Sequence, residues 1–190
     1  MMNLKSIACA VVMSCVVAKA GPLETAKELA ASRFDGWTYG SDATKKQVDC
    51  VQFLVAVVEK ELGHALKADE RNAILISPAP ADLPKAVVNG DSITKGVQYS
   101  LVDLVKAGTA VEPADAKAGD LVQYWMKKGD GSWIGHAAVI SKVFKDASGA
   151  QRASLYGAHE SLKKIADQDF GGGGLKLTGD DRRVYIVRKK

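Results

Sequence analysis

The chain has 190 residues, of which 47% are hydrophobic and 25% are charged, and its formal net charge at pH 7 is +4. This length fits one domain with a sizeable core, and nothing in the sequence suggests a second domain. So small a net charge gives no support for nucleic acid as a partner.

Residues 1–20 are predicted to be a signal peptide. Lys5 supplies a positive n-region, residues 7–17 form a short apolar run, and Ala-Lys-Ala at residues 18–20 is a small-x-small cleavage site. The apolar run is too short to serve as a permanent membrane span. We therefore expect an exported protein, periplasmic or extracellular, whose single domain occupies residues 21–190.

Removal of this segment would leave Cys50 as the only cysteine and, with Lys5 and Lys19 gone, would lower the net charge from +4 to +2. A disulfide within the mature chain is then impossible, although export would permit one. Cleavage before Cys15, where the sequence loosely resembles a lipobox, is an alternative that would leave a lipid-anchored protein.

The first half of the mature sequence is predicted to be helical. Residues 23–32 have helical spacing, whereas residues 33–41 are interrupted by glycines and are expected to form a loop. A short helix is expected over residues 67–77, and the three prolines of residues 78–84 should end any regular element there. Residues 93–106 again have helical spacing, and Gly108 is expected to close that helix.

A central helix is predicted over residues 49–62, because Asp49 is a good N-cap and Gly63 is a good stop. It is apolar on nearly every face, which places it in the middle of the domain. Cys50 lies in its first turn, where unpaired backbone N–H groups and the helix dipole stabilise a thiolate. We expect a pKa for Cys50 below the value of about 8.5 for a free thiol. A lone cysteine on an apolar helix is also typical of a small core residue.

From residue 118 onward, β-branched residues become more frequent and turn signals separate short strands. Hairpin-length connections imply antiparallel pairing. The four glycines at residues 171–174 predict a mobile surface loop, with a substrate-side flap as the alternative. Helices followed by strands indicate an α+β domain, in which N-terminal helices, with the Cys-bearing helix in the centre, pack on a C-terminal antiparallel β-sheet. The strands are expected at residues 121–125, 135–144, 153–159 and 184–188.

Two of the three histidines lie at the ends of predicted strands. His136 begins the second strand and His159 ends the third, so pairing of these strands would bring their side chains together at one edge of the sheet. Cys50 packed against that edge would complete a nucleophile, a base and an orienting group. His136 would then act as the base, and His159 would fix its tautomer. The remaining His64 is assigned to the surface as a cation at a helix C-terminus.

A zinc site built from Cys50, His136 and His159 is disfavoured, because none of them has the close partner spacing usual for zinc ligands. No metal is therefore expected.

Five short segments resemble, in this order, the landmarks of the NlpC-type cell-wall cysteine peptidases. The resemblance covers about residues 37–188 and implies a papain-like fold, with a cysteine on a helix that faces an antiparallel sheet. It also implies hydrolysis of an amide bond in the peptide part of bacterial peptidoglycan, without a metal or an organic cofactor. The segments are Trp37-Thr38-Tyr39-Gly40, Asp49-Cys50, residues 118–125, residues 135–140 and Ala158-His159.

Carried over by position, this resemblance assigns four roles. Cys50 would be the nucleophile, His136 the general base and His159 the third member of the catalytic group. Tyr39 matches the tyrosine whose hydroxyl helps to form the oxyanion site. Glu160, directly beyond His159, receives no catalytic role.

The sequence departs from the family pattern in two places. Val51-Gln52 stand where the family usually has Ser-Gly after the cysteine, which changes the shape of the substrate path beside the nucleophile. The gap between Cys50 and His136 is longer than is common in the family. Residues 66–93 are therefore expected to be a helical insertion that covers or shapes the cleft.

The expected function is that of an exported cysteine hydrolase that cleaves peptidoglycan stem peptides through a thioacyl-enzyme. A non-catalytic module that binds cell-wall peptide and an acyltransferase that uses the same cysteine are the alternatives. The stem peptide is the predicted partner. Nucleic acid and a stable membrane span are not expected, and the residues identify no inhibitor or immunity protein.

Overall fold

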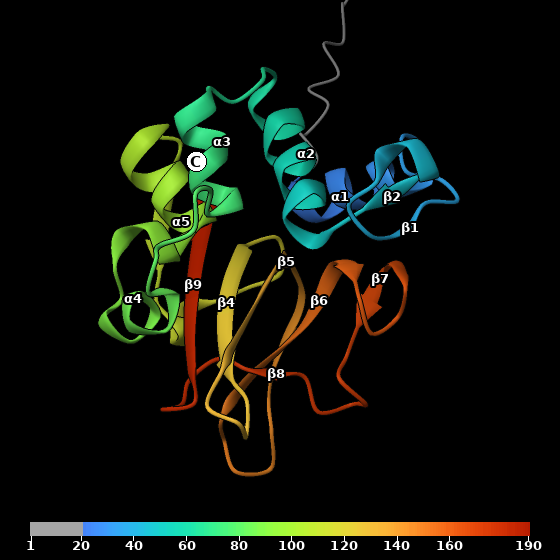
Figure 1. The fold of residues 1–190 in the computed structure, drawn as a ribbon. Coiled ribbons are helices and arrows are strands. Elements are labelled where there is room, and N and C mark those ends of the chain that lie inside the picture. Colours follow the sequence, from blue (N-terminus) through green and yellow to red (C-terminus); the bar gives the residue numbers. More distant parts are fainter. Residues whose placement is uncertain (1–20) are drawn as a thin grey trace, which may run out of the picture.

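The computed structural model describes residues 21–190, and Figure 1 shows it as a group of helices packed against a twisted β-sheet. The predicted mixed α+β class is confirmed. The predicted signal peptide, residues 1–20, and the alternative cleavage before Cys15 lie outside the described residues. None of the helices in the described part of the chain is long and apolar enough to cross a membrane.

The helices lie mainly in the first half of the chain and the long strands in the second. The α-helices are α1 Pro22–Ala31, α2 Cys50–Leu62, α3 Ala68–Leu75, α4 Leu83–Asn89 and α5 Val97–Tyr99. There are also short 3₁₀ helices, η1 Ala43–Lys45, η2 Ser92–Lys95 and η4 Pro113–Asp115, and a π-helical segment, η3 Ser100–Leu104. The strands are β1 Thr38–Tyr39, β2 Gln47–Val48, β3 Gly108–Val111, β4 Leu121–Lys127, β5 Trp133–Lys145, β6 Gln151–His159, β7 Lys164–Gln168, β8 Leu175–Lys176 and β9 Arg182–Lys189.

The strands form one sheet in the order β2-β1-β7-β6-β5-β4-β9-β3, with β8 paired to β6. Only β1 and β2 pair in parallel; the other pairs are antiparallel. The four predicted strands are confirmed as β4, β5, β6 and β9, which lie side by side. The sequence did not predict β1, β2, β3, β7 and β8, because strands of two to five residues are too short to display an alternating pattern.

The central helix α2 is confirmed, and its ends match the residues that predicted it. Gln52 N donates to Asp49 Oδ1 at 2.8 Å and Asp49 N donates to Gln52 Oε1 at 3.4 Å, which together form a capping box. Gly63 ends the helix in a left-handed conformation, with φ 76°. Phe53, Leu54 and Val57 are buried in the core shared by the helices and the sheet. This packing fixes Cys50 against β5, an interior strand of the sheet.

The predictions about the segment between α2 and β4 are only partly confirmed. Helix α3 ends at Leu75, before the prolines of residues 78–84, as expected, but Pro84 does not end an element: it lies in the first turn of α4, where a proline needs no backbone N–H. Residues 93–106 do not form one helix but divide into η2, α5 and η3. Gly96, at φ 55°, separates η2 from α5, whereas α5 runs directly into η3. A Cβ at Gly96 would lie 1.9 Å from Gln123 Oε1. Gly108 begins β3 instead of closing a helix.

The buried side chain of Gln123, on β4, holds two helices over the sheet. Its Nε2 donates to Ile74 O at 3.0 Å, and its Oε1 accepts from Val97 N at 2.8 Å. Both bonds join chain segments far apart in sequence, so α3 and α5 are fixed to the sheet by one amide. Residues after α3 also line the candidate site described below, so this amide positions part of that site.

We predict that Gln123→Ala lowers the free energy of unfolding by about 2–4 kcal/mol, because it leaves a buried N–H and a buried C=O without partners. Urea unfolding of the purified protein measures this change. Gln151→Ala is the matched control: its side chain makes one exposed bond of 3.5 Å to Ala114 O, and its loss should cost less than about 0.5 kcal/mol. Equal effects of the two substitutions would contradict the role given to Gln123.

Candidate active site

The central strands β5 and β6 bring His136 and His159 together. Val139 lies opposite Tyr156 in this antiparallel pair, and the same register, continued toward the ends of the two strands, sets His136 opposite His159. His136 Nε2 lies 3.0 Å from His159 Nδ1, and the ring centroids are 4.9 Å apart. The predicted contact between these two side chains is confirmed, because cross-strand neighbours share one face of a sheet.

The carbonyl of Leu155 determines which ring nitrogens carry protons. His159 Nε2 lies 3.2 Å from Leu155 O. Since a carbonyl oxygen only accepts, Nε2 of neutral His159 must be the protonated nitrogen. The Nδ1 atom of His159 is then an acceptor, and His136 donates to it from Nε2–H. This assignment leaves Nδ1 of His136 unprotonated and able to take a proton from a neighbouring group.

Cys50 is the first residue of α2, and only 8% of its surface is exposed. Its thiol has hydrogen bonds with the hydroxyl of Tyr39 and with the backbone of Ala137. Tyr39 belongs to β1, and Ala137 follows His136 directly in β5. Three elements therefore converge around the sulfur, and the one most distant in sequence, β5, carries the histidine predicted to act as the base.

Cys50, Tyr39 and His136 line one cavity of about 340 Å³. His159 lines a neighbouring cavity of about 320 Å³, which shares Tyr39 and His136 with the first. Among the described residues no hydrogen bond joins Cys50 directly to His136. Such bonds are often long in unliganded enzymes and tighten when substrate binds. The structure thus brings all four predicted residues to one place, with Tyr39 and His136 between the two cavities.

Apolar side chains that the sequence did not single out form one wall of the Cys50 cavity: Leu75, Ile76, Ala79 and Leu83. They come from the end of α3, the proline-containing segment and the start of α4. Residues 66–93 were expected to cover or shape a cleft, and these side chains do shape it.

The second cavity is also lined by residues to which the sequence assigned no chemistry. Glu160 and Phe170 both contribute to its wall. Phe170 directly precedes the glycines of residues 171–174, so the glycine run begins beside the site. This location could not be predicted, because it depends on the packing of the chain after β7 against β6.

The electrostatics of Cys50 differ from the sequence prediction. Burial raises the pKa of the Cys50 thiol, and the nearby charge of Asp49 raises it further. The hydrogen bonds from Ala137 and Tyr39 lower the pKa but do not reverse the shift. The expected low pKa is therefore wrong in direction. The residue that caps α2 places a carboxylate beside the sulfur, and the packing that makes α2 central removes the sulfur from water.

The two histidines are held neutral. Burial lowers the pKa of His136, and the neighbouring His159 lowers it further. Burial also lowers the pKa of His159, against opposing contributions from the backbone of Leu155 and of Ala166 and from the charge of Asp167. At neutral pH the site therefore contains a thiol and two uncharged imidazoles, so an attack by sulfur would require the proton to move to His136 during the reaction.

Other candidates lie outside this site. His64 is exposed just beyond the end of α2, and its Nδ1 lies 3.0 Å from Ala65 O. In the part of the chain that the structure describes, no group of three or more His, Cys, Asp or Glu residues could hold a metal ion.

Comparisons of the chain with protein-family models, with curated proteins and with solved structures found no match. The resemblance to NlpC-type peptidases therefore depends on the sequence segments given above.

We predict that iodoacetamide alkylates Cys50 slowly at pH 7, because a raised pKa leaves little thiolate. The rate should increase about tenfold for each pH unit up to the pKa of the thiol. Mass spectrometry of the peptide that contains Cys50 measures the rate, with free cysteine as the reference. A rate that is already at its plateau at pH 7 would show a thiolate and contradict the assignment of a protonated sulfur.

Proposed function

We propose that the protein is an exported cysteine hydrolase that cleaves amide bonds in the peptide part of bacterial peptidoglycan. The observation that carries this proposal is the hydrogen-bond chain from Leu155 O through His159 to His136. It leaves a basic nitrogen on a residue that lines the same cavity as Cys50. The choice of substrate is supported by the resemblance to NlpC-type peptidases, and export by the predicted signal peptide.

In the first half of the proposed reaction, the sulfur of Cys50 attacks the substrate carbonyl carbon while His136 Nδ1 takes the thiol proton. His159 stabilises the imidazolium that forms, by accepting from its Nε2–H. The proton then passes from His136 to the leaving amine, the C–N bond breaks, and a thioester remains on Cys50. His136 is neutral again at the end of this half-reaction.

In the second half, His136 removes a proton from a water molecule as that water attacks the thioester. The C–S bond breaks, the proton on His136 passes to the departing sulfur, and the carboxylic acid product is released with the thiol and neutral His136 restored. Each half passes through a tetrahedral oxyanion, for which the backbone N–H of Cys50 and the hydroxyl of Tyr39 are the proposed donors. Burial and nearby negative charge raise the pKa of Tyr39, so its hydroxyl stays protonated and able to donate.

A non-catalytic module that binds cell-wall peptide is the second candidate. It is favoured by one observation, the burial and raised pKa of Cys50, which suit a small packed side chain. The candidates differ in their products. A hydrolase releases peptide fragments with new carboxyl and amino ends, whereas a binding module retains intact peptide and releases none.

We predict that Cys50→Ala abolishes hydrolysis of purified peptidoglycan, since it removes the nucleophile, and that His136→Ala lowers the rate by about 10²- to 10⁴-fold. Mass spectrometry of the digests identifies the products and the bond that is cleaved. Thermal unfolding checks that both variants fold, and His64→Ala, in an exposed histidine outside the cavities, should keep full activity. Full activity in either of the first two variants would refute the proposed mechanism.

A separate prediction concerns the oxyanion site. Tyr39→Phe removes one hydroxyl and should lower kcat by about 10²- to 10³-fold, the usual effect of losing one oxyanion donor. Tyr156→Phe is the matched control, because Tyr156 is half-buried on β6 and lines neither cavity. If both substitutions leave kcat unchanged, Tyr39 is not an oxyanion donor.

A further inference from the structure

A third cavity lies on the other flank of α2 and contains none of the four candidate catalytic residues. It encloses about 360 Å³, and its wall includes side chains that can donate hydrogen bonds or stack. These polar and aromatic groups come from the loop after α1, from β2, from α2 and from α3: Arg33, Trp37, Gln47, Gln52, Glu59 and Arg71.

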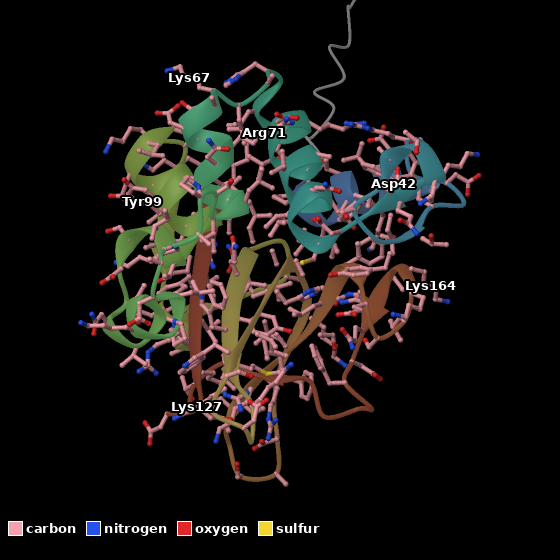
Figure 2. The ribbon with its side chains drawn as sticks, in the orientation of Figure 1. Asp42, Lys67, Arg71, Tyr99, Lys127 and Lys164 are labelled. Carbon is pink, nitrogen blue, oxygen red and sulfur yellow. The ribbon has the colours of Figure 1, made fainter. Side chains whose placement is uncertain are left out.

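The charged groups that line this cavity are two guanidinium groups, of Arg33 and Arg71, and one carboxylate, of Glu59. Arg71 Nη2 donates to Glu59 Oε1 at 3.0 Å, and the same oxygen also accepts from Leu66 N. Because a guanidinium has five N–H donors, this pairing leaves most of the donors of Arg71 unused. Figure 2 shows Arg71 between α3 and α2. The charge of Glu59 is therefore already shared, and the cavity retains a positive excess.

Arg33 has no hydrogen bond or ion pair with any of the described residues. Its guanidinium lies over the ring of Phe34, 5.0 Å from the ring centroid. Stacking of this kind leaves the in-plane N–H donors available, and paired N–H donors match the two oxygens of a carboxylate. Trp37, half-buried with its ring edge-on to Phe34 at 5.1 Å, adds an aromatic wall beside these donors.

The third cavity is a neighbour of the cleft of the candidate active site, and one side chain contributes to both. Leu75 lines both cavities. Residues of the first turn of α2 are divided between them, with Cys50 and Val51 on the cleft side and Gln52 on the other. A peptide whose scissile bond lies at Cys50 would reach the third cavity by passing Leu75.

We infer that this cavity binds a carboxylate group of the peptide substrate, at some distance from the bond that is cleaved, through Arg33 and Arg71. The inference rests on the proposed function for the identity of the substrate as a peptide. It adds a specificity-determining site to that function, because a substrate whose carboxylate is amidated would lose the charge-assisted hydrogen bonds to both guanidinium groups.

The test measures binding, with Cys50→Ala protein so that no probe is consumed. The probes are two peptidoglycan tripeptides, L-Ala-γ-D-Glu-L-Lys with free carboxylates and the same peptide with its carboxylates amidated. Calorimetry should give a Kd at least about tenfold lower for the free acid, a difference of about 1.4 kcal/mol. Adding Arg33→Gln, in an exposed side chain, should remove most of this preference, and adding Arg71→Gln should do the same if the variant remains folded.

Lys45→Gln is the matched control. It removes one positive charge from the neighbouring turn η1, where Lys45 pairs with Asp42 at 3.0 Å, but Lys45 does not line the cavity. The preference for the free acid should survive this change. A second readout locates the bound peptide. Binding should change the tryptophan fluorescence, and part of this change should come from Trp37. That part should be lost in Trp37→Phe, and it should also be lost in Arg33→Gln.

Equal affinity for the two peptides overturns the inference, as does a preference that survives Arg33→Gln. Failure of both peptides to bind at millimolar concentration overturns it as well. These outcomes are distinct from failure of the proposed function, because hydrolysis of peptidoglycan by the unmodified protein is measured independently. If the protein hydrolyses peptidoglycan but shows no preference for the free carboxylate, only the inference about the third cavity is refuted. If it binds with this preference but hydrolyses nothing, only the proposed enzymatic activity is refuted.

Discussion

The hydrogen bond between Leu155 O and His159 Nε2 is the constraint on which the proposed chemistry depends. It forces His159 to accept from His136, and this in turn leaves Nδ1 of His136 as the basic nitrogen. Because His159 is only 1% exposed, water cannot readily replace either partner, and a buried hydrogen bond is stronger than an exposed one. Both rings are positioned by the antiparallel register of β5 and β6, so the sheet itself determines the proton arrangement.

Asp49 has two opposing effects on the site. Its carboxylate accepts from Gln52 N and begins α2 at Cys50, which a strong N-cap stabilises by about 1 kcal/mol. The same negative charge lies beside the thiol and raises its pKa. At the N-terminal end of α2, the carboxylate of Asp49 thus stabilises the helix and destabilises the thiolate form of Cys50. The helix is kept, and in the proposed mechanism the sulfur loses its proton to His136 only at the moment of attack.

Local signals predicted the elements that carry the site. Asp49 and Gly63 bounded α2, and turn residues bounded the strands that carry His136 and His159, so the contact between the two imidazoles followed from pairing of adjacent strands. The predictions that failed concerned features that depend on distant parts of the chain. The two-residue strand that bears Tyr39 exists because β2 and β7 pair with it. Two residues are too few to show a pattern from which this pairing could be predicted.

The same distinction explains the other differences. The spacing over residues 93–106 is helical, but the side chain of Gln123 from β4 fills the space beside Gly96 and accepts from Val97 N, so α5 begins only at Val97. The direction of the pKa shift at Cys50 was misjudged because the helix dipole can be inferred from sequence, whereas burial requires the packed fold. The third cavity also escaped prediction, since Arg33 and Arg71 belong to separate elements that meet only in the folded chain.

Nitrogen-15 NMR of the three imidazoles at pH 7 tests the central claim most directly, because long-range couplings report which ring nitrogen carries each proton. The structure predicts that His136 and His159 are both neutral and protonated at Nε2, with exposed His64 as the internal reference. A proton on Nδ1 of His136, or a charged His136 ring, would contradict this account, because no basic nitrogen would then remain to activate the sulfur of Cys50.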